Sequence, residues 1–133
     1  MEDEPEFPLG LKAWITYLAG RHDPIRVSNK ILGDPKFIRI RRVGGTARLL
    51  VLDDATMIIS VYAEDDEQCE RFAQEVRASV HSAKGRRLMD GVNCKGITEF
   101  SGPYEDPDED HASSRWSWSF GSPLRAVPLK ESQ

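Results

Sequence analysis

An α+β fold is predicted for this chain, in which two helices pack on one face of a mainly antiparallel sheet of four to five strands. Three observations lead to this prediction. Segments with period-two alternation occur in two groups, and the short connections inside each group favour hairpins. A segment with helical spacing precedes each group. The length of 133 residues fits one ordinary domain, which we place over residues 1–133 with an acidic tail over 1–8.

The first helix is expected directly after Pro8 and is expected to end at Gly20. Its apolar residues fall on one helical stripe: Leu9, Leu11, Trp14, Ile15 and Leu18. We expect Trp14 to lie in the core or in a subunit contact, because buried aromatic area is the usual role of such a residue. Residues 25–27 then form a short extended piece, and a loop over 29–36 leads to the main strands.

The first long strand is predicted over residues 37–43, where β-branched residues alternate with arginines. Ile38 and Ile40 can therefore face a core while Arg39 and Arg41 point to the opposite side. Gly44-Gly45 is predicted to be a turn, because glycine adopts positive φ without steric cost.

Two further extended segments follow that turn. Residues 48–52 are largely apolar, and Asp53-Asp54 marks a second, shorter break. Residues 57–63 are the strongest strand candidate of the chain, with Ile59 and Val61 on one face. We expect this strand to lie at or near the centre of the sheet.

The second helix is predicted to begin at Asp65 or Asp66, because Asp65 and Gln68 have the spacing of a capping box. Gly85 is expected to end it. Its apolar residues share one face: Cys69, Phe72, Ala73, Val76 and Val80. The opposite side carries charged and polar residues, so one face of this helix is predicted to pack on the sheet.

The second strand group follows that helix. Residues 91–100 are predicted to form a strand with a bulge near Gly96, and residues 115–120 form a period-two strand that closes the sheet. Between them, residues 103–112 form an acidic, proline-containing loop that buries too little apolar surface to order itself. Residues 123–133 are expected to form a C-terminal tail. The predicted core lies between sheet and helices: Ile38, Ile40, Ile59, Val61, Phe72, Val76, Trp116 and Trp118.

Composition and charge exclude little by themselves. The net charge of −4 is mild, so the overall field favours no particular charged partner. No apolar run approaches the ~20 residues of a membrane span, and the acidic start is unlike a signal peptide, so we expect a protein that stays in the cytoplasm. Cys69 and Cys94 lack metal-ligand spacing, and both are predicted to be small buried residues.

Motifs that would indicate an enzyme were not found in the sequence. His22, His81 and His111 have no nucleophile motif nearby, although a triad is a spatial arrangement that sequence does not exclude. Gly44-Gly45 lacks the further glycine and lysine of a phosphate-binding loop. The acidic run over 105–110 lacks the ligand pattern of a calcium loop. We therefore expect no catalytic residues, no metal and no cofactor.

Four arginines on the first strand and its turn are the candidate site residues: Arg39, Arg41, Arg42 and Arg48. Guanidinium groups this close repel one another unless carboxylates or phosphates match them. We expect them to form a protein-contact surface or to face a lumen; the alternative is a strand face that is simply solvated. Direct nucleic-acid recognition is less well supported, because no wider basic patch or aromatic RNA-binding signature is present.

The sequence resembles the tail terminator proteins of long-tailed phages, particularly those that infect actinobacteria. The resemblance extends from about residue 9 to 125 and rests on FIRIRRVGGT at 37–46, a strand ending VYA at 61–63, an acidic-capped helix and RWSWSF at 115–120. Only the phrase RRVGGT at 41–46 can be matched residue by residue. The resemblance implies an α+β subunit of a hexameric ring at the head-proximal end of the tail, assembled in the host cytoplasm.

In such a ring the protein would cap the major tail tube protein, stop tube polymerisation and contact a head-tail connector or stopper protein. Genomic DNA would pass through the lumen without sequence-specific binding, and no enzyme activity or membrane is implied. Two alternatives remain: another neck component, such as a tail completion or head-tail joining protein, and a small nucleic-acid-binding regulator. A ring is a large discrete oligomer, whereas a regulator is usually a monomer or dimer.

Overall fold

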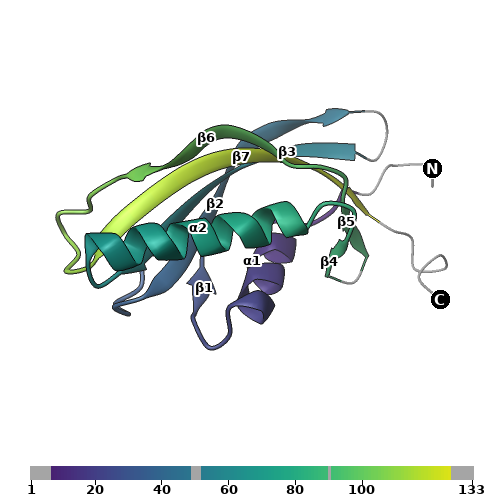
Figure 1. Ribbon diagram of the computed structural model, residues 1–133. Helices are drawn as coiled ribbons and strands as arrows, with labels where there is room; N and C mark the ends of the chain where they lie inside the picture. Colours follow the sequence, from purple (N-terminus) through teal and green to yellow (C-terminus); the bar gives the residue numbers. More distant parts are fainter. Residues whose placement is uncertain (1–6, 49–51, 90, 127–133) are drawn as a thin grey trace.

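The computed structural model describes residues 7–48, 52–89 and 91–126, and these form an α+β fold with both helices on one side of a curved sheet (Figure 1). The helices are α1 (Gly10–Arg21) and α2 (Asp66–Ser82). The strands follow in chain order: β1 (Val27–Ser28), β2 (Phe37–Arg48), β3 (Leu52–Ala63), β4 (Arg87–Met89), β5 (Val92–Cys94), β6 (Thr98–Glu105) and β7 (Ser114–Ala126). The predicted α+β class is confirmed.

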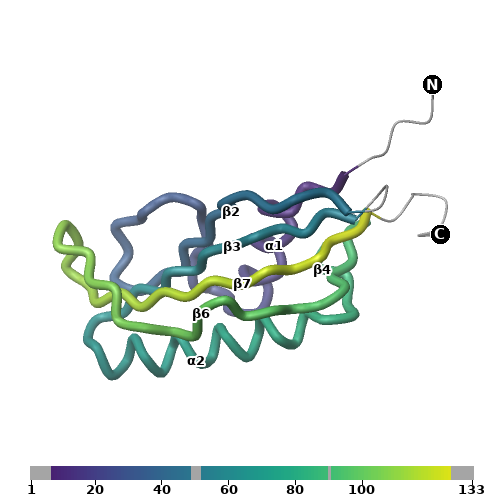
Figure 2. The backbone as a smooth tube through the Cα atoms, turned by 90° about the horizontal axis from the view of Figure 1, so that it is seen from above, coloured from purple at the N-terminus to yellow at the C-terminus, as the bar shows by residue number. Residues whose placement is uncertain are grey.

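The sheet is larger than expected and is mixed. It has seven strands in the order β1-β2-β3-β7-β5-β4, and β6 pairs with another part of β7. The β1–β2 pair is parallel and the other pairs are antiparallel. The prediction of four to five mainly antiparallel strands was therefore wrong in number and missed the parallel pair. Figure 2 shows β2 along one side of the sheet and β6 along the opposite side.

β2 and β3 form a long antiparallel pair that is interrupted only by a bulge. Gly44 and Gly45 have φ values of 122° and 115°, and the register shifts between Arg42 and Gly45. The predicted turn at Gly44-Gly45 is therefore wrong: positive φ serves a bulge here and the strand continues. Asp53 and Asp54 likewise lie inside β3, so no break occurs there. Leu49, Leu50 and Val51 of the expected 48–52 segment lie outside the described residues.

The chain after α2 also differs from its prediction. Residues 91–100 form parts of two strands, β5 and β6, and β6 continues through Gly102-Pro103 into the region predicted to be a loop. β7 is longer than the predicted 115–120 and includes residues 123–126 of the predicted tail, whereas residues 127–133 lie outside the described residues. β7 does not close the sheet: it pairs with β3 on one edge and with β5 and β6 on the other. The few residues outside the described ranges include both chain ends.

The core lies between the helices and the sheet. Seven of the eight predicted core residues are buried, and Trp116 is partly buried against them. The predicted face of α2 is buried, and the Asp65 side chain caps the helix by accepting a 2.9 Å hydrogen bond from the Gln68 amide. Both of these predictions are confirmed.

The stripe predicted for α1 needs one correction. Trp14 and Leu18 are fully buried, but Leu9 precedes the helix and is 67% exposed. Gly10 faces the sheet instead, where an added Cβ would come within 2.9 Å of Leu124. The close approach of α1 to β7 therefore depends on a residue without a side chain.

Both cysteines are buried, as predicted. Burial raises the pKa of the Cys69 thiol to about 11, so this group is a poor nucleophile at neutral pH. Among the described residues, no helix is long and apolar enough to cross a membrane.

Candidate functional site

The face of the sheet opposite the helices, called the open face below, carries most of the predicted site. Ile38 and Ile40 of β2 are fully buried toward the helices, so by alternation Arg39 and Arg41 point to the open face. In β3, Ile59 faces the core while Ser60 and Tyr62 lie on the open face. The sheet therefore separates an apolar, helix-covered side from a polar side.

Arg42 and Arg48 are each neutralised by a carboxylate of β3. Arg42 donates hydrogen bonds of 2.7 Å from both Nη atoms to Asp53, and its Nε donates to the carbonyl oxygen of Gly44. Arg48 binds Asp54 through Nε and Nη2 at 2.8 and 3.1 Å. The hydrogen bonds from Arg48 lower the pKa of Asp54. Two of the four guanidinium groups are thus matched by carboxylates, because the side chains of Arg42 and Arg48 reach diagonally across the β2–β3 pair to Asp53 and Asp54.

Arg39 and Arg41 remain as the basic part of the predicted site. Arg39 donates from Nε to the carbonyl oxygen of Asn29 at 3.1 Å, and partial burial together with the charge of Arg41 lowers its pKa. Arg41 Nε is buried and has no hydrogen-bond partner among the described residues. Neither side chain forms an ion pair within the described residues. These two arginines are therefore the ones available to a partner.

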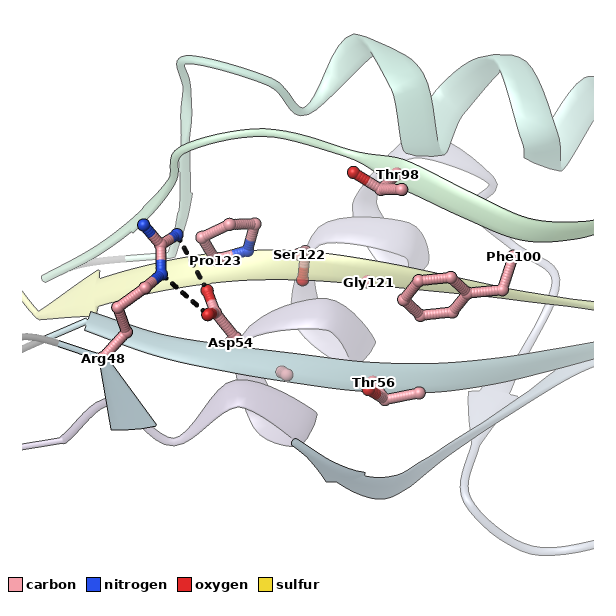
Figure 3. A pocket seen from close by; sticks show the side chains of 9 residues that line it. Arg48, Asp54, Thr56, Thr98, Phe100, Gly121, Ser122 and Pro123 are labelled. Carbon is pink, nitrogen blue, oxygen red and sulfur yellow. Dashed lines mark hydrogen bonds and ion pairs between the residues drawn. The ribbon is translucent and has the colours of Figure 1, made fainter. Parts of the chain in front are cut away.

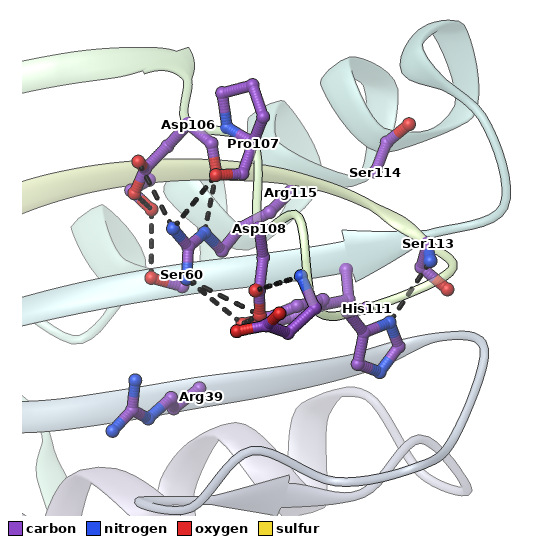
Figure 4. Close-up of polar contacts among 12 residues, drawn as sticks. Arg39, Ser60, Asp106, Pro107, Asp108, His111, Ser113, Ser114 and Arg115 are labelled. Carbon is purple, nitrogen blue, oxygen red and sulfur yellow. Dashed lines mark hydrogen bonds and ion pairs between the residues drawn. The ribbon is translucent and has the colours of Figure 1, made fainter.

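A polar cluster that the sequence did not indicate covers one end of the open face (Figure 4). Arg115 donates from Nε to the carbonyl oxygen of Asp106 at 2.6 Å and from Nη1 to the Tyr62 hydroxyl at 3.2 Å. Tyr62 in turn donates to Asp108 at 3.1 Å. Ser117 donates to the Asp106 carboxylate at 2.7 Å and also contacts Ser60.

The acidic loop takes part in this cluster and folds back onto the sheet. Besides Asp106 and Asp108, His111 donates from Nε2 to the carbonyl oxygen of Leu32 at 2.8 Å, while its Nδ1 accepts from the Ser113 amide. These two bonds fix the neutral tautomer with the proton on Nε2. Residues 103–105 of the loop predicted over 103–112 belong to β6, and polar contacts, in place of apolar burial, hold the rest of the loop against the sheet.

The opposite end of the open face has a shallow groove lined by both polar and apolar groups (Figure 3). Phe100 of β6 is 60% exposed and lies over Gly121, where an added Cβ would come within 2.8 Å of its ring. The Arg48–Asp54 pair borders the same groove. Because its charged groups already neutralise one another, the groove offers a contact surface and no arrangement for acid–base chemistry.

The helix side contains a Ser–His contact that requires a chemical test. His22 Nε2 lies 2.9 Å from Ser79 Oγ, and burial lowers the pKa of His22. Ser79 Oγ donates to the carbonyl oxygen of Glu75 in its own helix, so His22 donates to Ser79 and does not act as its base. Ser79 also lies inside α2, where backbone amides are used by the helix and none can stabilise an oxyanion. This contact joins α1 to α2.

The third histidine belongs to an ion-pair cluster between α2 and β6. Arg77 donates to both carboxylate oxygens of Glu99 at 2.6 and 2.7 Å, and His81 Nε2 lies 2.7 Å from Glu99. The hydrogen bonds from Arg77, with a smaller contribution from His81, lower the pKa of Glu99 to about 2. The cluster fastens β6 to the helix.

Among residues 7–48, 52–89 and 91–126, no group of three or more His, Cys, Asp or Glu side chains could hold a metal ion. No protein-family model matches the chain, and a search of curated proteins found no match. The functional interpretation therefore rests on the resemblance noted in the sequence and on the geometry of the open face.

Proposed function

We propose that the protein is a phage tail terminator, a structural subunit that assembles head-to-tail into a ring of six on the finished tail tube. The ring stops tube polymerisation and offers its other surface to the head-tail connector or stopper protein. The protein thus belongs to the neck of the virion and assembles in the host cytoplasm. The size of the ring and the identity of these partners follow from the family that the sequence resembles.

The observation that carries the proposal is the Arg39/Arg41 pair at the β2 side of the open face. Both guanidinium groups lie on a sheet face that no helix covers, and neither has a carboxylate partner among the described residues. A partly buried charge without a counter-charge is costly for an isolated subunit. A neighbouring protein that supplies carboxylates would remove that cost, as expected for a subunit of an assembly.

The nucleic-acid-binding alternative has less support from the same geometry. Arg42 and Arg48 are already bound to Asp53 and Asp54, so two of the four arginines are not free to neutralise phosphates. Affinity for nucleic acid depends on the number of phosphates that are neutralised. DNA that passes through a ring without specific contacts does not require a surface of free basic side chains.

Two measurements on the wild-type protein test the proposal. Size-exclusion chromatography with light scattering should give one species of about six times the subunit mass of 15.0 kDa. Electron microscopy of purified tail tubes mixed with the protein should show it at one end only, with no further tube growth. A monomer or dimer that does not bind tube ends would contradict the proposal.

A further inference from the structure

The two long sides of the sheet differ in charge. β2 pairs with β1 only at Ile38 and Arg39, so from Ile40 to Arg48 no described strand pairs with its outer edge. On the other side, β6 pairs with β7 and with no further described strand. Figure 2 shows these two strands on opposite sides of the sheet. Each subunit therefore has two unlike sheet edges, which is the requirement for head-to-tail association.

The β2 edge carries the basic surface, defined here as Arg39 and Arg41. The two side chains lie on the same face of one strand, two residues apart. Partial burial lowers the pKa of Arg39, and the charge of Arg41 lowers it further, as expected for like charges held close together. Such a pair favours a partner that supplies negative charge.

The last residue of β6 and the loop after it carry the acidic surface, defined here as Glu105, Glu109 and Asp110. All three residues are exposed, and none forms an ion pair within the described part of the chain. The neighbouring Asp106 and Asp108, in contrast, lie against Arg115 at 3.3 and 3.8 Å. The acidic run is thus divided into carboxylates that hold the loop in place and carboxylates that are left for a partner.

An exposed aromatic residue adjoins the acidic surface. Tyr104 of β6 pairs with Ser117 of β7, so its side chain points to the open face, and it is 49% exposed. Glu105 pairs with Trp116, so its side chain points to the other face, at the end of β6. Tyrosine is enriched in protein interfaces, and an arginine can lie over its ring. The acidic surface therefore offers two kinds of contact to a guanidinium group.

We propose that the basic surface of one copy of this chain contacts the acidic surface of the next copy, and this inference rests on the ring proposed above. The two surfaces consist of different residues, so each copy can use both at once. The contact is made by side chains: Pro103 and two register shifts in β6 prevent a regular backbone ladder along that strand. Charge complementarity then sets which edges meet and in which order.

Two charge-reversed variants test this contact. One variant reverses the basic surface (Arg39→Glu with Arg41→Glu), and the other reverses the acidic surface (Glu105→Lys, Glu109→Lys and Asp110→Lys). Each alone should fold, as judged by circular dichroism, and should associate at least ten-fold more weakly than the wild type. An equimolar mixture should restore the ring, because each reversed surface then meets its complement. Six is even, so the two variants can alternate around the ring.

A matched control places the same charge change elsewhere. Lys84 and Arg87 are exposed near the end of α2, and neither forms an ion pair within the described residues. The variant Lys84→Glu with Arg87→Glu changes the net charge by the same amount as the basic-surface variant. It should form rings like the wild type, which separates a local contact from an effect of total charge.

The outcomes distinguish this inference from the proposed function. If the wild type forms rings and both variants do so too, or if the mixture fails to restore them, the two surfaces do not meet and the inference is overturned while the ring stands. If the wild type is a monomer that does not bind tube ends, the proposed function and this inference both fail. Should a reversed variant not fold, two milder variants replace the pair. One neutralises the basic surface (Arg39→Gln with Arg41→Gln), and the other neutralises the acidic surface (Glu105→Gln, Glu109→Gln and Asp110→Gln). If both associate as strongly as the wild type, the proposed contact is overturned.

Discussion

Arg42 of β2 reaches diagonally to Asp53 of β3 and donates two hydrogen bonds of 2.7 Å to its carboxylate, and Asp53 is only 6% exposed. Both lie on the helix side of the sheet, near the start of α1, where a Cβ at Gly10 would lie 3.6 Å from Arg42 Nη1. Arg42 thus belongs to the packing of the subunit. It was expected to be an interface residue because it lies beside Arg39 and Arg41 in the sequence.

Replacing Arg42 by Ala should destabilise the protein by roughly 2 to 3 kcal/mol, because it leaves a buried carboxylate without its partner. Arg48→Ala is the matched comparison, since the Arg48–Asp54 pair has similar geometry but more exposed side chains. It should cost less than about 1 kcal/mol. Urea denaturation at pH 7 measures both, and equal losses would contradict the assigned role of Arg42.

The two glycines of the β2 bulge should differ in their tolerance of alanine. Both have positive φ, so each Ala variant carries backbone strain of roughly 1 to 3 kcal/mol. A Cβ at Gly44 meets nothing within 4 Å, whereas a Cβ at Gly45 would overlap the carbonyl oxygen of Asp54. Gly45→Ala should therefore lower the melting temperature clearly more than Gly44→Ala, and the reverse order would show that the bulge is placed wrongly.

Glu99 should make stability depend on pH in the acid range. Its pKa is lowered from 4.5 to about 2 in the folded protein, so the unfolded chain takes up a proton first. The stabilisation is complete above pH 4.5 and is lost as the pH falls toward 2. The difference in unfolding free energy between wild type and Glu99→Gln should shrink over that range.

Urea midpoints between pH 6 and 2 measure this difference. Glu67→Gln serves as the control. It removes a carboxylate from the exposed Arg71–Glu67 pair of α2, and we expect it to have a small effect on the unfolding free energy. If the difference in unfolding free energy between wild type and Glu99→Gln stays constant across the whole pH range, the ion-pair cluster is contradicted.

Phe72 should be one of the most costly core positions. It is 2% exposed on the face of α2 that packs on the sheet, and its ring meets His22 edge-on at 6.1 Å. Phe72→Ala should destabilise by roughly 3 to 5 kcal/mol. Phe100→Ala, which removes the same ring from an exposed position, should have a much smaller effect on the melting temperature. Similar losses from both variants would contradict the assignment of Phe72 to the core.

The acidic loop should bind no specific metal. Asp106 and Asp108 are already engaged by Arg115, Ser117 and Tyr62, so their oxygens are not free to form a coordination shell. Calorimetric titration with calcium and magnesium should show no saturable micromolar binding. Such binding, if lost when Asp106, Asp108 and Asp110 are replaced, would overturn this prediction.

Local sequence signals predicted the parts of the fold that depend on local structure. The Asp65 cap and the buried stripe of α2 involve residues within one or two turns of one another, and both were predicted correctly. The bulge at Gly44-Gly45 was predicted as a turn because the same residue and the same φ serve both structures. A bulge forms here because Gly45 pairs with Ala55 of the next strand and the ladder continues. That pairing depends on a residue ten positions away and is not visible in the local sequence.

The candidate site shows the same limit. Alternation along β2 placed Arg39 and Arg41 opposite Ile38, but the partners of Arg42 and Arg48 depend on the register with β3, which sequence alone did not reveal. The order in the acidic loop was missed for a related reason. Its main anchor, Arg115, follows the loop in the sequence and was assigned only an outward position on the next strand.

The three tryptophans of the chain all lie on the helix side of the sheet. Trp14 and Trp118 are buried, and Trp116 packs against the same core. The indole of Trp14 donates to Ser122 within that core at 3.0 Å. The intrinsic fluorescence therefore reports on unfolding of the subunit. If copies of the chain associate through the open face as proposed, the indoles stay in place, and a probe attached to that face would follow association independently of unfolding in one sample.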